Sequence, residues 1–160
     1  MPAFLFFKIK NFGFMKISVA SDHAGFEYKE RLKELLKSLG HEVVDFGCFS
    51  PDSSDYPDFA YPAAKAVGNG ECERGIFICG TGVGVSIVAN KVKGVRAANC
   101  CSVEEAKLSR QHNTANVLTF GARLISWELA KEIVKVWLET EFDGGRHERR
   151  VEKIHKLTGL

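Results

Sequence analysis

Short apolar runs alternate with amphipathic segments along most of the chain. The apolar runs have the length and composition of buried strands, and the segments between them carry apolar residues at helical spacing. The pattern predicts strands at 16–20, 41–47, 75–79, 95–100 and 116–121. It predicts helices before Gly40, at 57–68, 83–92 and 103–110, between Trp127 and Leu138, and at 147–158. Such alternation indicates an α/β protein with a five-stranded parallel sheet that is covered by helices on both faces.

The first residues, "MPAFLFFKIKNFGF", do not fit this pattern. Their apolar run is shorter than the core of a signal peptide and far shorter than a membrane span. A second methionine, Met15, stands directly before the first predicted strand. We therefore expect residues 1–14 to be a mis-assigned start or a dispensable extension, and residues 15–160 to form one domain with no membrane partner.

Composition and charge narrow the classes of partner. The chain is 45% hydrophobic and 26% charged, as soluble globular proteins are, and its net charge of +2 gives no reason to expect a nucleic-acid partner. The five cysteines are odd in number and match no zinc spacing. We expect free thiols, mostly in the core, in a reducing cytoplasm, and we expect no metal and no cofactor.

Ligands of parallel sheets bind at the carboxyl ends of the strands. The residues that follow predicted strands are Asp22 and His23, then 80–84, then Cys101 and Ser102, then 121–123. The search for a functional site therefore concentrates on these positions.

The stretch "ICGTGVGVS" places glycines at every second position after Cys79. The dinucleotide fingerprint G-x-G-x-x-G is not met, since Val85 stands where its third glycine belongs, so a nucleotide-binding regulatory module is only a remote alternative. A row of backbone N–H groups at a helix N-terminus suits an oxyanion or a small phosphate, and its field favours a thiolate at Cys79. The alternative is that Cys79 only ends a buried strand and the glycines permit close packing.

Three further groups of residues carry candidate chemistry. Asp22 and His23 form an acid–base pair or a helix cap, and His112 with Asn113 lies in the connection before the last strand. Arg146 and Arg150 stand one helical turn apart, and with Arg123 they supply three arginines to one possible anion site. The alternative for the arginines is a solvated charged face.

Taken together, these stretches resemble the ribose-5-phosphate isomerase B family, which includes galactose-6-phosphate isomerase subunits. The matching stretches run in order from Met15 to the C-terminus: "SDHAGFEYKERL", "DYPDFA", "ICGTGVGVSIVANKVKGVRAA", "SRQHNTANVLTFGAR" and "EFDGGRHERRVEKI". The resemblance implies a three-layer α/β/α Rossmann-like domain with a five-stranded parallel sheet. It also implies a homodimer, in some members a tetramer, with active sites shared across the interface and a C-terminal helix that reaches toward the partner. It also implies metal-independent aldose–ketose isomerisation of a sugar phosphate.

The resemblance assigns roles residue by residue. Cys79 matches the base, Thr81 a proton-handling hydroxyl, and Gly80, Gly82, Val83 and Gly84 belong to the anion hole. His112, delivered with Asn113 by the partner subunit, matches the acid that opens the sugar ring, and Asp22 and Tyr56 bind sugar hydroxyls or the ring oxygen. The phosphate is held by His23, Arg146, His147 and Arg150, with Arg123 from the neighbouring subunit.

The implied reaction interconverts D-ribose 5-phosphate and D-ribulose 5-phosphate through ring opening and a cis-enediolate. Some family members have serine at the position of Cys79 and a glutamate a few residues later, where this chain has Val83 and Gly84. This chain therefore resembles the thiol-using branch. The alternative within the same class is a hexose-phosphate isomerase that acts on allose 6-phosphate or galactose 6-phosphate.

Overall fold

The computed structural model describes residues 13–160, so most of the expected extension, residues 1–12, lies outside the described residues. Within this range the predicted strands and helices are all present, with ends that differ by a few residues. The elements are β1 Lys16–Ser21, α1 Phe26–Ser38, β2 Glu42–Asp45, α2 Tyr56–Gly68, β3 Arg74–Cys79, α3 Val83–Asn90, β4 Ala97–Asn99, α4 Val103–Asn113, β5 Val117–Gly121, α5 Trp127–Glu139 and α6 Arg146–Thr158.

The five strands form one parallel sheet in the order β2-β1-β3-β5-β4, which confirms the predicted fold class. The chain passes from β1 to β2 on one side and then crosses to β3 on the other, so its direction of winding reverses between β1 and β3. A crevice opens at the carboxyl ends of the strands at such a switch point. The edge strand β4 is shorter than predicted because the Arg96 N–H donates to the Asn116 side chain (2.7 Å) rather than to a neighbouring strand.

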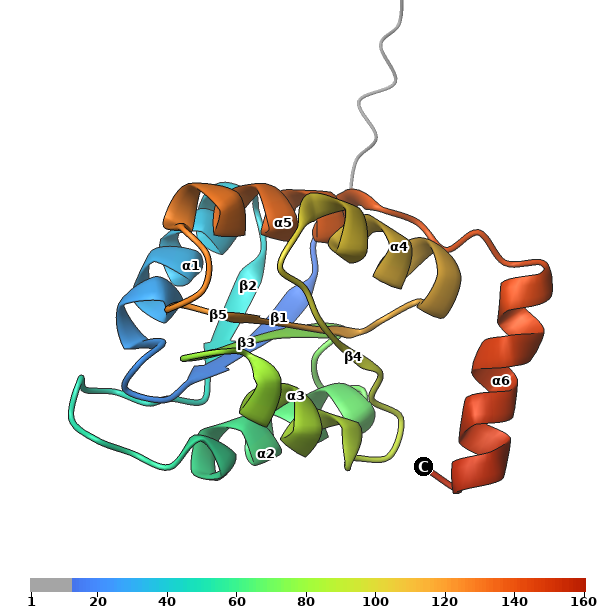
Figure 1. Cartoon of the computed structure of the whole chain (residues 1–160), viewed down its shortest axis with the longest axis horizontal. Coiled ribbons are helices and arrows are strands. Elements are labelled where there is room, and N and C mark those ends of the chain that lie inside the picture. Colours follow the sequence, from blue (N-terminus) through green and yellow to red (C-terminus); the bar gives the residue numbers. More distant parts are fainter. Residues whose placement is uncertain (1–12) are drawn as a thin grey trace, which may run out of the picture.

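Helices α1, α4 and α5 cover one face of the sheet, and α2 and α3 cover the other (Figure 1). Successive residues of β3 serve the two faces in turn: Ile76 and Ile78 pack with α1 and α5, whereas Phe77 and Cys79 pack with α2 and α3. This double burial explains the unbroken apolar run of the strand. It also directs the Cys79 side chain toward the side of the sheet on which α3 begins.

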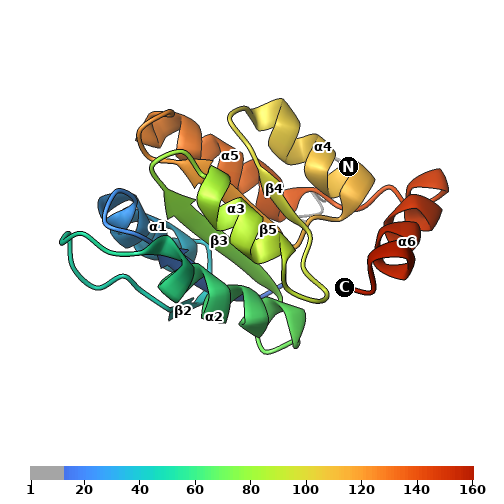
Figure 2. The ribbon, with the colours of Figure 1, turned by 60° about the horizontal axis from the view of Figure 1, so that its bottom comes forward.

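Helix α6 stands outside these layers, beyond the amino ends of the strands and next to the end of α4 (Figures 1 and 2). Val151 is its one buried residue, while Ile154 and Leu157 are 45% and 78% exposed. Among residues 13–160, no helix combines the length and the apolar character that crossing a bilayer requires.

A buried ion pair fixes the start of the loop that joins β2 to α2. Lys29 is fully buried and its Nζ lies 2.7 Å from Asp45, which Lys33 also contacts at 2.9 Å. Burial of Asp45 works to raise the pKa of its carboxyl, but the hydrogen bonds and charges of the two lysines hold this pKa below its ordinary value. The carboxylate also accepts a hydrogen bond from the Gly47 N–H (2.9 Å), and this contact orients the loop toward the carboxyl edge of the sheet.

Candidate active site

The ends of β1 and β3 lie side by side, with Ser21 paired to Ile78. Asp22, the residue after β1, therefore lies at the level of Cys79, the last residue of β3, at the carboxyl ends of the strands. Asp22 is 8% exposed, and its Oδ1 accepts hydrogen bonds from the N–H groups of Ala24 (2.9 Å) and Gly25 (3.1 Å). The carboxylate thus shapes the tight turn before α1 and is also held in a fixed position at the sheet edge.

The Cys79 thiol is nearly buried, with 4% of the residue exposed, and its Sγ accepts a hydrogen bond from the Gly82 N–H (3.1 Å). Gly82 has a φ of +81°, and a side chain at this position would meet the backbone of Phe120 at 2.6 Å and the Asn99 Oδ1. Glycine is therefore required here, and the turn that it permits aims a backbone donor at the sulfur. An N–H donor and a helix N-terminus both stabilise negative charge on a thiolate.

Helix α3 begins at Val83 without a side-chain cap. The N–H groups of a first helical turn have no partner inside the helix and point out of its N-terminus, as an anion site requires. The Val83 N–H lies 3.2 Å from the Thr81 Oγ1, and the Tyr56 ring covers Gly84 so closely that a Cβ there would be 2.7 Å from its Cζ. Thr81 and Tyr56 therefore both lie against the turn.

A hollow of about 540 Å³ adjoins the turn, lined by Asp22, His23, Tyr56 and the residues before α2. The His23 Nδ1 accepts a hydrogen bond from the Ser54 N–H (3.1 Å), so in the neutral ring the proton resides on Nε2. The Ser54 Oγ is buried and has no hydrogen-bond partner within residues 13–160. The hollow therefore offers a carboxylate, an imidazole N–H and a phenol beside the thiol-bearing turn.

Arg123 follows β5 and lies across the glycine turn of its own chain. Its backbone N–H donates to the Gly80 carbonyl (3.1 Å), and its Nη1 is 3.2 Å from the place of a Cβ at Gly80. The sequence analysis expects this arginine to come from the neighbouring subunit, whereas the structure holds it beside Gly80 of its own chain.

The other two candidates at strand ends have structural roles. Ser102 caps α4 by accepting a hydrogen bond from the Glu105 N–H (3.1 Å), and Cys101 is exposed. The remaining four cysteines are buried, and all five are free thiols, as predicted. Burial raises the pKa of the Cys100 thiol to about 12, so this cysteine is a core residue.

A second group of candidate residues lies at the end of α4. The sequence places His112 and Asn113 in a connection, but they form the last turn of α4, which ends at Thr114 in the left-handed conformation (φ +42°). Buried Arg110 fixes this end of the helix, since its guanidinium donates to the Thr140 and Ala115 carbonyls at 3.2 and 2.7 Å. The side chains of His112 and Asn113 are therefore presented by the last turn of a helix rather than by a loop.

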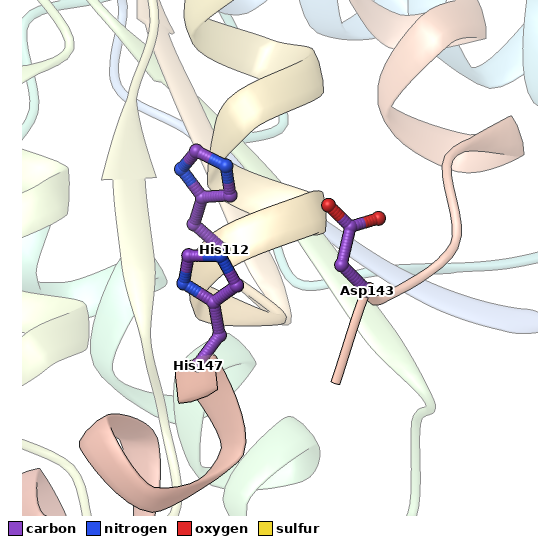
Figure 3. A group of neighbouring side chains, drawn as sticks. All are labelled: His112, Asp143 and His147. Atoms are coloured by element: carbon purple, nitrogen blue, oxygen red, sulfur yellow. The ribbon is translucent and has the colours of Figure 1, made fainter. Parts of the chain in front are cut away.

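Helix α6 brings further residues to this second group. It begins at Arg146, so Arg146 and Arg150 share one face as predicted, and His147 stacks on His112 with ring centroids 4.3 Å apart and planes 12° apart (Figure 3). The pKa of His147 is held below its ordinary value by the loss of hydration beside its neighbours and by the positive charges of His112, Arg146 and Arg150.

The group around Cys79 lies at the carboxyl ends of the strands, and the group around His112 lies near their amino ends. Helix α4 runs from the carboxyl end of β4 back to the amino end of β5, and four residue steps of β5, roughly 13 Å, separate Val117 from Gly121. The prediction of one anion site for three arginines is therefore wrong within a single chain. Arg123 belongs to the group around Cys79, whereas Arg146 and Arg150 belong to the group around His112.

Asp143 is a member of the second group that the sequence analysis missed. Ligand atoms of His112, Asp143 and His147 all lie within 4.8 Å of one another, and the Asp143 N–H donates to the Gln111 carbonyl (3.0 Å). The long separation of Asp143 from His112 in the sequence follows no recognised ligand spacing, so only the packing of α6 near α4 reveals the cluster.

Comparison with known proteins identifies the family of this chain. The chain matches the Ribose/Galactose Isomerase family over residues 17–154. It is 50% identical over 139 residues to the ribose-5-phosphate isomerase B of Escherichia coli (87% of this chain, 93% of that one), and 43% identical over 142 residues to the D-erythrulose-4-phosphate isomerase of Pectobacterium atrosepticum (88% and 93%). The structure of ribose-5-phosphate isomerase B from Clostridium thermocellum superposes with a TM-score of 0.89 at 51% identity, covering 91% of this chain and 98% of that one. The chain therefore belongs to the ribose/galactose isomerase family, whose members are enzymes that isomerise sugar phosphates.

Proposed function

We propose that this enzyme interconverts D-ribose 5-phosphate and D-ribulose 5-phosphate with the Cys79 thiolate as the base. The observation that carries the proposal is the hydrogen bond from the Gly82 N–H to the Cys79 Sγ at the N-terminus of α3. It joins a potential base and a set of backbone donors in one rigid turn. Removal of a proton next to a carbonyl needs both.

The thiolate and the backbone donors have separate roles in the proposed reaction. The thiolate takes the proton from carbon 2 of the open-chain aldose, and the electron pair moves toward the carbonyl to form a cis-enediolate. Backbone N–H groups of residues 80–84 stabilise the negative oxygen, where the loss of one such donor typically costs about 10²-fold or more in rate. The Thr81 hydroxyl lies at the rim of this turn and relays a proton between the two enediolate oxygens, before carbon 1 is protonated to give the ketose.

Ring opening requires an acid at the ring oxygen and a base at the anomeric hydroxyl. Asp22 is placed for the base, and we assign the acid to His112. Since His112 lies at the opposite edge of its own chain, it acts in the site of a partner subunit. We therefore propose a homodimer, able to assemble further into a tetramer, in which α6 reaches toward the partner and Asn113 accompanies His112 into the shared site.

In the proposed dimer, residues of both subunits bind the phosphate. His23 and Arg123 come from the chain that supplies Cys79, and Arg146, His147 and Arg150 come from its partner. Arginines one helical turn apart bind a phosphate dianion through charge-assisted hydrogen bonds. Because the phosphate does not react, its binding energy positions carbon 2 over the sulfur, while Tyr56 orients the sugar hydroxyls.

The alternatives to this proposal differ in the number of carbon atoms in the sugar. The relative from Pectobacterium atrosepticum, named for a four-carbon substrate, makes D-erythrulose 4-phosphate a second candidate. Allose 6-phosphate and galactose 6-phosphate are six-carbon alternatives. The five free thiols support a reducing cytoplasm as the place of action.

An assay of the purified protein against these sugar phosphates, with EDTA present, tests the proposal. We expect the highest kcat/KM for D-ribose 5-phosphate and no loss of rate with the chelator. A higher kcat/KM for a four- or six-carbon substrate would replace the proposed substrate, and inactivity toward all of them, together with binding of NAD or ATP, would contradict the isomerase assignment.

A further inference from the structure

The stacked histidines and Asp143 form a cluster that the proposed reaction does not explain completely. His112 and His147 are half-buried, Asp143 is exposed, and their ligand atoms converge within 4.8 Å (Figure 3). Figure 3 shows the two imidazole rings one above the other, presented by α4 and by the start of α6, with the Asp143 carboxylate at their side. Within residues 13–160, none of the three side chains makes a hydrogen bond or an ion pair, so their ligand atoms are available.

We propose that His112, Asp143 and His147 bind a divalent transition metal ion such as Zn²⁺. Two imidazole nitrogens and one carboxylate oxygen are a common three-ligand set for zinc, with a fourth position left open for water or another ligand. Zinc bonds of about 2.0–2.2 Å at tetrahedral angles place ligand atoms about 3.4 Å apart. The two ring planes lie 12° apart, so at least one imidazole must turn out of the stack for both nitrogens to bind one ion, and the exposed Asp143 side chain must rotate toward them.

Local charge and backbone contacts decide whether a cation is tolerated. Arg146 and Arg150 lie on α6 together with His147, and their positive charges oppose the binding of a cation. Asp143 supplies a compensating negative charge beside the two rings. The backbone hydrogen bond from Asp143 to Gln111 holds the segment before α6 against α4. The three ligands are therefore brought together before any ion arrives, which lowers the entropic cost of binding.

The consequence for catalysis rests on the proposed function. A bound ion occupies one ring nitrogen each of His112 and His147, which the proposed function assigns to ring opening and to phosphate binding. Zinc at this site therefore inhibits the isomerase and competes with the sugar phosphate. A chelator reverses the inhibition because no covalent bond is made.

Direct binding of Zn²⁺ to the full chain tests the site without reference to activity. Calorimetry in metal-free buffer lacking phosphate should give one ion per chain. Asp143→Asn and His147→Asn should each weaken this binding on the order of 10- to 100-fold or more. Glu148→Gln removes a carboxylate from the same first helical turn and Cys101→Ser removes the exposed thiol, and both should leave the affinity unchanged.

Two results would overturn the proposal: no stoichiometric binding, or binding that Cys101→Ser abolishes while Asp143→Asn does not affect it. The activity readout is separate. Asp143→Asn should resist zinc at concentrations that inhibit the wild type, when the activity of each protein is expressed relative to its own metal-free turnover. Zinc binding in a chain that isomerises no sugar phosphate would leave the metal site standing and reject the proposed function alone.

Discussion

The Gly82 N–H donates to the Cys79 Sγ across 3.1 Å, and this contact places a nearly buried thiol at the mouth of a helix N-terminus. The glycine turn is thus more than a close-packing device between strand and helix. Its Gly82 N–H is directed at the sulfur, and a base held close to backbone donors is the arrangement that proton abstraction next to a carbonyl demands.

Replacing Cys79 by alanine removes the proposed base while leaving the surrounding donors in place. We expect kcat to fall by about 10²–10⁴-fold, in line with the loss of a positioned general base, while the Kd for the sugar phosphate changes little. Exchange of the carbon-2 hydrogen with deuterated solvent, followed by NMR, should cease. Near-normal exchange in this variant would assign the base to another residue.

Replacing Gly82 by alanine tests the turn itself. The positive φ costs about 1–2 kcal/mol for a residue with a Cβ, and here the new atom also meets the backbone of Phe120. Gly40→Ala is the matched control, since Gly40 has a φ of +88° and open space around its Cβ position. Urea unfolding should show a larger loss for Gly82→Ala than for Gly40→Ala, and only the former should lose activity. Equal losses would show that the contact with Phe120 is unimportant.

Arg146→Ala should mainly raise KM. Loss of charge-assisted hydrogen bonds of about 1.5–3 kcal/mol corresponds to a rise of roughly 10- to 100-fold, with kcat much less affected. Arg31→Ala removes the same charge from an exposed position on α1 and should change neither constant. Inhibition by phosphate-bearing sugar analogues measures the affinity directly, and an unchanged inhibition constant would remove Arg146 from the site.

His41 makes stability depend on pH. It is 8% exposed, its Nδ1 accepts a hydrogen bond from the Met15 N–H (3.2 Å), and its pKa is lowered by burial and by the charge of Arg74, against a smaller opposing effect of Glu73. The folded chain therefore favours the neutral ring. This contribution to stability is complete above the ordinary histidine pKa, about 6.5, and is lost as the pH falls through the lower folded value.

Urea unfolding at a series of pH values checks this. The free energy of unfolding should decrease below about pH 6.5 by at most about 1.4 kcal/mol per pH unit from this group, and His41→Gln should flatten that decrease. The same slope in the variant and the wild type would assign the pH dependence to other groups.

The sequence predicted one half of the site better than the other, for a physical reason. Asp22, His23 and the turn after Cys79 directly follow buried strands, and the register of a parallel sheet brings such residues together. His112 and Arg146 depend instead on where α4 ends and how α6 packs, which local periodicity does not determine. The proximity of Asp143 to His112 follows from the same tertiary packing and was missed, whereas Arg123 follows β5 closely and was named from its position at a strand end.

Mixing two inactive variants tests most directly whether the active site is shared between subunits. Cys79→Ala and His112→Asn each disable every site in their own homodimers, but a mixed dimer has one site with an intact Cys79 and a partner's intact His112. If sites are shared between subunits, random exchange should restore about a quarter of wild-type specific activity, because half of the dimers are mixed and each has one working site. Mixed dimers that form, as mass spectrometry of tagged subunits would show, yet remain as inactive as their parents would contradict the shared site.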